Sequence, residues 1–353
     1  MAFRAARAVL LDAIARGVFP AASVDVGTAR AVLWRDAVGR LAGNGSALAQ
    51  ADTIFDLASL TKVLATATVA MRLVDRARLD LDDPIGRWFP EWRGNDRDGV
   101  TVEDVLSHAS GLPAWLPLYR EHRGREAYAR AIAETPLEYA PRARSVYSDL
   151  GFILLGFVAE DMGGEPLDAL FGGVRARLGL DDIAFLPPVN WRARTAPTGE
   201  DPWRGRGLVG EVHDENAAAL GGIAGHAGLF GTAPAVGAFA RQMLRAWKGD
   251  AEACEQLASQ PTVIRFTSRR EIPGSSRALG WDTMLPASSC GTRMSSLAFG
   301  HTGFAGTSLW IDPVAGIYVV LLTNRAHLSR DSAAITEVRR AFHDAVMQQW
   351  GRE

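Results

Sequence analysis

The segment DLASLTKVLAT, residues 56–66, contains a serine and a lysine three positions apart, Ser59 and Lys62. The chain has 38 cationic side chains, and only Lys62 and Lys248 among them are lysines. An arginine is effectively always charged, whereas a desolvated lysine can lose its proton and act as a base. A lysine at position 62 therefore indicates proton transfer beside a hydroxyl, although a single lysine among many arginines also arises by chance.

Residues 59–74, SLTKVLATATVAMRLV, predict a helix that is apolar nearly all round and therefore buried. Side chains three positions apart lie on one face of a helix, so we expect the Lys62 amine beside the Ser59 hydroxyl at the helix N-terminus. Desolvation lowers the pKa of a lysine, and a neutral amine could accept the serine proton. The alternative, a serine and a lysine on the surface, conflicts with the apolar character of the segment.

Three further segments follow in the order LSHASGLP (106–113), YSDLGF (147–152) and HTGF (301–304). Together with SLTK they resemble the motifs of the serine β-lactamase and penicillin-binding-protein superfamily, in its class C-like branch. SLTK resembles the SxxK motif, YSDLGF the Tyr-x-Asn motif, and HTGF the Lys-Thr-Gly motif on a strand. Their order along almost the whole chain makes the resemblance far more specific than a single SxxK.

The resemblance implies a role for each matching residue. Ser59 would be the nucleophile, and Lys62 would be its amine partner. Tyr147 would be the general base for acylation and for the deacylating water, its phenolate favoured by nearby positive charge. The backbone N–H groups of Ser59 and Phe304 would form the oxyanion hole. Without the motifs, Tyr147 would be interpreted as a half-buried core tyrosine.

Two positions depart from the family pattern. Asp149 stands where the family has asparagine, which adds a negative charge and removes an amide donor. His301 stands where the family has lysine, and a histidine is mostly neutral at pH 7 unless its surroundings perturb it. Together with Thr302 and Gly303, these residues are expected to contact the substrate. Because these changes remove a donor and a positive charge from the expected substrate site, we expect at most weak β-lactamase activity. Relatives with histidine at the position of His301 are esterases, D-aminopeptidases or peptidases.

A narrower likeness lies in GEVHDENAAALGGIAGHAGLFGTA, residues 210–233. It resembles β-lactamase-like proteins associated with bacterial cell-wall recycling, including an exo-acting amidase that releases peptide from N-acetylmuramic acid. The segment contains His213, Asp214, Glu215 and His226. Their spacing matches no standard zinc-ligand pattern, so we favour a capping or loop-fixing network and expect no metal.

Composition argues against several classes of function. Acids and bases are nearly balanced at a net charge of −2, so no nucleic-acid-binding surface is indicated. The glycine-rich residues 220–231 lack the spacing of a phosphate-binding loop. Cys254 and Cys290 have neither metal-ligand nor disulfide-framework spacing and are expected to be reduced thiols. We expect a cofactor-free protein with a small-molecule or short-peptide substrate.

Residues 1–20 are basic and apolar, but Asp12 and Arg16 interrupt the apolar run. This pattern predicts an amphipathic first helix rather than a signal peptide. No apolar run reaches the roughly 18 residues that a membrane-spanning helix needs. The simplest localisation is cytoplasmic, with export as the alternative if a leader has been removed, and the oligomeric state stays unknown.

Strand-like segments lie near both ends of the chain and helical segments lie between them. The expected strands cover residues 21–27, 31–42, 278–285, 297–311 and 316–324, and a final amphipathic helix covers 332–350. Residues 59–262 show almost no strand-like alternation, so we expect a mainly helical region, with helix starts at Thr101, where Asp104 completes a capping box, and at Thr232.

This arrangement predicts an α/β fold of the α+β type. An antiparallel sheet of about five strands would be flanked by N- and C-terminal helices and would carry a large, mainly helical insertion, as in the β-lactamase/transpeptidase-like fold that the resemblance implies. The expected domains are residues 1–58 with 263–353 for the sheet and 59–262 for the helices, and the active site would lie at their seam.

These residues predict a serine hydrolase that forms an acyl-enzyme at Ser59 and hydrolyses an amide or an ester. The candidate substrate is a peptidoglycan-derived peptide or a D-amino-acid derivative. The alternatives are a carboxylesterase of small acyl esters, a weak β-lactamase, a zinc hydrolase, and a non-catalytic module that binds penicillin or peptides. A buried lysine is energetically costly, which favours catalysis over binding alone.

Overall fold

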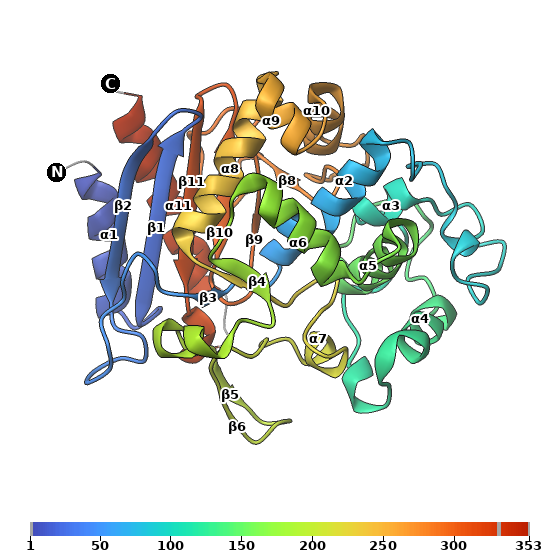
Figure 1. The fold of residues 1–353 in the computed structure, drawn as a ribbon, viewed down its shortest axis with the longest axis horizontal. Helices are drawn as coiled ribbons and strands as arrows, with labels where there is room; N and C mark the ends of the chain where they lie inside the picture. The colour runs from blue at the N-terminus through green and yellow to red at the C-terminus, as the bar shows by residue number, and fades with distance from the viewer. Residues whose placement is uncertain (1–2, 330–332, 352–353) are drawn as a thin grey trace.

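The fold is built on a six-stranded antiparallel sheet whose strands come from both ends of the chain (Figure 1). The computed structural model describes residues 3–329 and 333–351. The strand order in the sheet is β2-β1-β11-β10-β9-β8. The strands are β1 (Ala21–Thr28), β2 (Val32–Gly39), β8 (Asp282–Thr283), β9 (Phe299–Thr302), β10 (Ser308–Asp312) and β11 (Ile317–Thr323). Because β1 pairs with both β2 and β11, the N-terminal and C-terminal segments meet inside the sheet.

The two faces of the sheet carry different helices, because side chains alternate between the faces along each strand. Val24 packs in the apolar cluster formed with α1 (Arg4–Ala15) and α11 (Ala333–Trp350). Tyr318 points to the opposite face, where α8 (Ala233–Trp247) crosses β1 and β11 (Figure 1). A helix from the middle of the chain therefore covers the sheet that the two ends build.

The rest of the middle region is mainly helical and shares one large apolar core with the α8 face of the sheet. Its α-helices are α2 (Ala67–Asp75), α3 (Val102–Leu106), α4 (Gly124–Glu134), α5 (Asp149–Gly163), α6 (Leu167–Leu178), α7 (Glu215–Ala219), α9 (Ala251–Gln256) and α10 (Gln260–Thr267). The shorter helical turns of this region are η1 (Lys62–Thr66), η2 (Ile85–Arg87), η3 (Leu118–Arg120) and η4 (Val189–Arg194), and a further one, η5 (Arg325–His327), follows β11.

Five short strands of the described chain lie outside the main sheet. They are β3 (Phe55–Asp56), β4 (Ile183–Phe185), β5 (Gly199–Asp201), β6 (Arg206–Leu208) and β7 (Leu229–Gly231). β3, β7 and β4 form one small sheet, and β5 and β6 form another. The strands β4 to β7 lie within residues 59–262, the region expected to be mainly helical. Each of these four has only three residues, too few to display a periodic pattern in the sequence.

Several predicted helix features are confirmed. Thr101 and Asp104 form the capping box at the start of α3, and the Thr232 side chain caps α8. The buried face of α11 includes Val338 and Phe342, as its spacing predicted. These features depend on neighbours within a few residues, which is why the sequence alone reveals them.

Both cysteines are free thiols, and Cys290 is buried. Burial raises the pKa of the Cys290 thiol to about 12, so it stays protonated at neutral pH. Among the described residues, no helix combines the length and apolar character needed to cross a membrane.

Glycines let the loop of residues 220–228 pack directly on α5. The backbone of Gly225 lies against Gly156, and a Cβ added at Gly225 would lie 2.0 Å from the carbonyl oxygen of Phe152. Thr66 donates a hydrogen bond of 2.7 Å to the carbonyl oxygen of Gly225. These contacts hold the loop, including His226, against the helical segment that carries Lys62.

We expect Gly225→Ala to lower the free energy of unfolding by at least about 1–3 kcal/mol, because the added methyl group meets backbone atoms that cannot rotate away. Urea unfolding measures this loss. Gly173→Ala is the control, since Gly173 is exposed inside α6 and an added Cβ there meets no atom within 4 Å. A Gly225→Ala protein as stable as the parent would contradict the close packing.

Candidate active site

Ser59 follows β3 through a strained turn. Ala58 has a φ of +48°, a left-handed conformation that is uncommon for a residue with a side chain. The Ala58 N–H donates to Asp56 Oδ1 at 2.8 Å, and the His213 N–H donates to Asp56 Oδ2, also at 2.8 Å. The buried Asp56 thereby ties the turn before Ser59 to the loop before α7. Burial raises the pKa of this carboxyl to about 6.

The helical segment after Ser59 is buried all round, as predicted. Every residue from Lys62 to Leu73 is buried, across the π-helical turn η1 and most of α2. Single π-helical turns are uncommon and occur frequently at functional sites. The Ser59 and Lys62 side chains are brought together as their spacing predicted, with Lys62 Nζ at 3.2 Å from Ser59 Oγ.

The Lys62 ammonium has one acceptor for each of its three N–H bonds. Besides Ser59 Oγ, these are Asp149 Oδ1 at 2.6 Å and the carbonyl oxygen of His226 at 3.1 Å. Asp149 begins α5, and His226 lies on the glycine-rich loop that packs on α5. Segments that are far apart in the sequence therefore converge on one buried charge.

The expectation of a neutral lysine amine is wrong. Burial by itself would lower the pKa of Lys62, but the negative charge of Asp149, with Tyr147 contributing when it is ionised, raises the pKa above its ordinary value. Lys62 is therefore an ammonium that can stabilise negative charge beside Ser59, rather than a free base. Asp149 borders the cavity beside Ser59, but its Oδ1 atom is engaged by Lys62.

Tyr147 lies close to Ser59 and Lys62, with Lys62 Nζ 4.8 Å from the centre of its ring. Its buried hydroxyl faces the side chains of Lys62 and Ser59, and both of them favour the ionised phenolate. Burial raises the pKa of the phenol, the charge of Lys62 lowers it, and the charge of Asp149 raises it again. Lys62 thus favours the phenolate as predicted, but the net shift of the pKa is upward. The phenolate is a minority form at neutral pH.

His301 lies beside Tyr147 and does not line the cavity next to Ser59. The side chain is buried, and the centre of its ring lies 5.8 Å from that of Tyr147. Nδ1 lies 2.8 Å from the carbonyl oxygen of Thr302, so Nδ1 carries the proton and Nε2 is left as an acceptor. Burial and the charges of Arg277 and Lys62 hold the pKa of His301 well below its usual value. The predicted neutral imidazole is therefore consistent with its surroundings.

The turn after β9 brings Phe304 next to the nucleophile. A Cβ added at the buried Gly303 would lie 2.6 Å from the carbonyl oxygen of Leu57 and 3.2 Å from the Cβ of Ala58. Thr307 Oγ1 donates to the same Leu57 oxygen at 3.0 Å. Within the described chain, the N–H groups of Ser59 and Phe304 donate to no other group. Two free N–H groups next to a serine hydroxyl are what an oxyanion hole requires.

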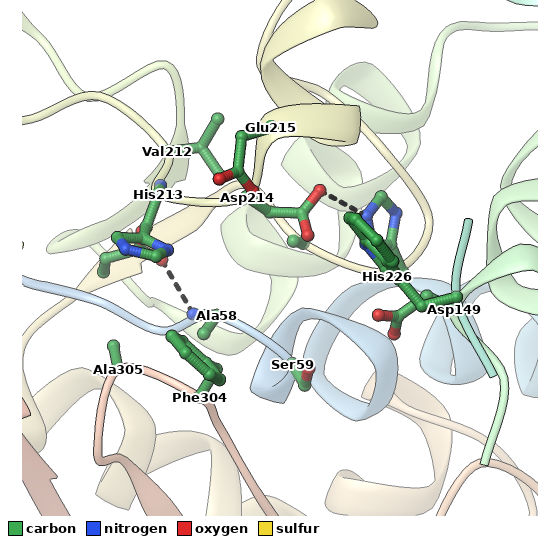
Figure 2. Close-up of a pocket in the computed structure, with 13 residues that line it drawn as sticks. Ala58, Ser59, Asp149, Val212, His213, Asp214, Glu215, His226, Phe304 and Ala305 are labelled. Atoms are coloured by element: carbon green, nitrogen blue, oxygen red, sulfur yellow. Dashed lines mark hydrogen bonds and ion pairs between the residues drawn. The ribbon is translucent and has the colours of Figure 1, made fainter. Parts of the chain in front are cut away.

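Ser59 opens into a cavity of about 320 Å³ (Figure 2). In Figure 2, Ser59 lies between Phe304 and Asp149, with the Asp214–His226 pair across from it. The side chains of Phe304 and Trp115 border the cavity and are 44% and 43% exposed, so both are accessible to a substrate. The cavity is large enough for a short peptide or a small acyl group.

Within residues 210–233, His226 and Asp214 form a contact that fixes the loop, the kind of arrangement favoured for this segment. His226 Nε2 lies 2.7 Å from Asp214 Oδ1, and the Asp214 side chain also caps α7. Burial opposes ionisation of Asp214, but His226 outweighs burial and holds the pKa of this carboxyl at about 2. No group of three or more His, Cys, Asp or Glu side chains in the described chain is arranged to hold a metal ion.

Sequence reasoning missed two side chains that contact Tyr147. The His108 ring packs on Tyr147 with ring centres 4.8 Å apart, and its only signal was its place in LSHASGLP. Arg277 lies over the same ring, with Cζ 5.2 Å from its centre. Arg277 is half-buried and has no hydrogen bond or ion pair to its guanidinium among the described residues. Nothing in the sequence distinguishes it from the other arginines.

Comparison with known proteins gives consistent matches. The family model described as Beta-lactamase matches residues 6–343. A protein of Escherichia coli (strain K12) named "Putative D-alanyl-D-alanine carboxypeptidase" is 32% identical over 310 residues, which cover 78% of this chain and 70% of that protein.

The structure of "EstCE1, a hydrolase with promiscuous acyltransferase activity" is 24% identical with a TM-score of 0.77 over 98% of both chains. A beta-lactamase from Sulfitobacter sp. EE-36 is 19% identical with a TM-score of 0.79, over 99% of this chain and 98% of that chain. At these identities the two structures establish the fold alone.

Lys62→Arg is expected to abolish acylation of Ser59, because a planar guanidinium cannot replace an ammonium that fits three fixed acceptors in a buried site. Labelling of Ser59 by a fluorescent phosphonate measures the loss, and the melting temperature shows whether the variant folds. The control is Lys248→Arg at the exposed end of α8, which should label at the parent rate. A folded Lys62→Arg protein that labels normally would contradict this role of the lysine.

Asp149→Asn should shift the rising limb of the pH profile of kcat/KM to lower pH. Asp149 raises the pKa of Tyr147, so removal of its charge lowers that pKa and the reactive phenolate forms at lower pH. We expect a shift of roughly one pH unit, equivalent to about 1.4 kcal/mol.

Tyr147→Phe is the comparison for this experiment. Its pH profile of kcat/KM should lack the rising limb, and its turnover should be lower by roughly 10²- to 10⁴-fold. A limb that does not move in Asp149→Asn, or that persists in Tyr147→Phe, would assign the ionisation to another group.

Proposed function

We propose that this chain, which belongs to the beta-lactamase family of serine hydrolases, removes the C-terminal residue of a short peptide through an acyl-enzyme at Ser59. The relatives named for D-alanyl-D-alanine carboxypeptidase activity support a peptide substrate that ends in a free carboxylate. The proposal depends mainly on one feature of this chain, the unpaired guanidinium of Arg277.

Arg277 offers a binding site for that carboxylate. Its guanidinium lies over the Tyr147 ring, and the Lys62 ammonium contacts the same ring. The positive charge of Arg277 contributes to the lowered pKa of both His108 and His301, so it lies close to the buried side of the site. A half-buried arginine without an anionic partner is ready to bind a carboxylate through two parallel hydrogen bonds. In the family pattern a lysine stands at position 301, and here Arg277 would supply the missing positive charge.

The reaction would begin with attack of Ser59 Oγ on the carbonyl carbon of the scissile bond. Tyr147, in its phenolate form, would accept the serine proton, and the Lys62 ammonium would stabilise the negative charge on both oxygens. The N–H groups of Ser59 and Phe304 would bind the oxyanion of the tetrahedral intermediate.

The second half of the reaction returns the enzyme to its starting state. Tyr147 would pass the proton to the nitrogen of the departing amino acid, and the bond between the carbonyl carbon and that nitrogen would break. A water molecule, deprotonated by Tyr147, would then attack the carbonyl carbon of the ester formed with Ser59. As the bond to Ser59 Oγ breaks and the shortened peptide leaves, Tyr147 would return that proton to Ser59 Oγ. No cofactor is needed in this sequence of steps.

Arg277→Gln should lower kcat/KM for an N-acyl-D-alanyl-D-alanine peptide by roughly 10- to 100-fold, because a hydrogen bond between charged groups contributes about 1.5–3 kcal/mol. The same variant should change kcat/KM for the C-terminal amide of that peptide by less than about threefold, since this substrate has no carboxylate to bind. The matched control is Arg144→Gln, because Arg144 also lies over a tyrosine ring, but that of Tyr139 rather than that of Tyr147.

Two results would contradict the proposal. Equal losses on the acid and the amide would show that Arg277 does not bind the substrate carboxylate. Turnover of a p-nitrophenyl ester by the parent protein, without release of D-alanine from the peptide, would instead favour a carboxylesterase.

A further inference from the structure

A buried arginine lies directly behind the turn that carries Phe304. Arg339, on α11, is only 6% exposed. One of its nitrogens, Nη2, donates to the carbonyl oxygen of Gly303 at 2.7 Å and to that of Thr307 at 2.8 Å. In the part of the chain that the structure describes, no carboxylate lies within ion-pair distance of Arg339. Its positive charge is thus directed at backbone carbonyl groups alone.

The Gly303 carbonyl and the Phe304 N–H belong to the same amide group. A cationic donor on an amide oxygen draws electron density from the amide nitrogen and makes the N–H a stronger donor. The Phe304 N–H has no acceptor within the described residues, and it lies next to the turn that precedes Ser59. Arg339 therefore acts on the amide whose N–H is available to an oxyanion beside Ser59.

We propose that Arg339 is a positioning residue of the oxyanion hole, whose guanidinium polarises the Gly303–Phe304 amide and strengthens the Phe304 N–H as a donor to the developing oxyanion. This inference rests on the proposed acyl transfer at Ser59. It does not depend on which acyl group or leaving group the enzyme uses.

The unpaired charge argues against a purely structural link. Burying a charged group without an opposite charge costs several kcal/mol, whereas a neutral amide side chain could donate to the same carbonyls at a smaller cost. Burial, and then the neighbouring Arg325, lower the pKa of Arg339 to about 9, which leaves the side chain charged at neutral pH. Arg325 itself donates to the carbonyl oxygen of Phe304, the next amide along. Two cations thus act on successive amides of this turn.

Arg340, the next residue on α11, is a matched control. Its guanidinium also donates to two backbone carbonyls, those of Ser288 at 3.1 Å and Pro286 at 3.0 Å. The residue type, the helix and the kind of acceptor are the same, but the acceptors are not part of the turn beside Ser59. Substitution of Arg340 therefore measures the effect of removing an arginine–carbonyl contact of α11 that lies outside the oxyanion hole.

The experiment compares Arg339→Gln, Arg339→Lys and Arg340→Gln in the full chain. Hydrolysis of p-nitrophenyl acetate gives kcat and KM, and the ³¹P NMR signal of the adduct between Ser59 and a fluorophosphonate reports on the oxygen in the oxyanion hole. Loss of a whole oxyanion donor costs about 10²- to 10³-fold in kcat, so weakening one donor should cost roughly 10-fold. For Arg339→Gln we expect this fall in kcat, a KM within about twofold and a displaced ³¹P signal.

The controls separate charge from structure. Arg339→Lys keeps the charge and should retain kcat within about threefold, and Arg340→Gln should match the parent in kcat and in the ³¹P signal. A folded Arg339→Gln protein with parent kcat and an unmoved ³¹P signal would overturn the inference. If Arg339→Gln does not fold, a folded Arg339→Lys protein that has lost 10-fold or more in kcat would overturn it equally, because charge would then not be the operative property. A parent protein that forms no phosphonate adduct would instead overturn the proposed function at Ser59.

Discussion

The buried ammonium of Lys62 is the interaction on which the rest of the site depends. A charge removed from water must find its partners inside the protein. Here those partners come from the Ser59 turn, from the first residue of α5 and from the glycine-rich loop. Position 225 must be glycine, because a side chain there would clash with the backbone of α5. The close approach brings the neighbouring His226 carbonyl within hydrogen-bond distance of the ammonium. Fold and site are thus coupled through one charge.

An aspartate at position 149 changes the charge balance of this centre. It neutralises Lys62 within the pair and raises the pKa of Tyr147, which lies against both. The histidine at position 301 is neutral and adds no positive charge. The remaining positive charges near the centre belong to arginines on other elements, with Arg277 above the Tyr147 ring and Arg339 behind the Gly303 carbonyl. The site thus holds the electrostatic elements of an acyl-transfer centre, distributed differently from the family pattern.

The sheet and the helical region meet where this chemistry is placed. The turn after β9 packs against Leu57 and Ala58, because Gly303 has no side chain and Thr307 is bonded to the Leu57 carbonyl. The C-terminal helix α11 reaches the same turn from the other face of the sheet through Arg339. The turn that carries the Phe304 N–H is therefore held both by the segment before Ser59 and by α11.

The sequence by itself determined the features that depend on near neighbours. These include the Ser59 and Lys62 pair on one buried helix, the caps at Thr101 and Thr232, and the apolar face of α11, because helical spacing and capping act over three or four residues. The order of the motifs added the family and the fold. Only the tertiary structure decided the protonation of Lys62, since the carboxylate that raises its pKa lies 87 residues away along the chain. It alone also singled out Arg277 and Arg339, because whether an arginine is buried, and what it faces, is a property of packing and not of residue type.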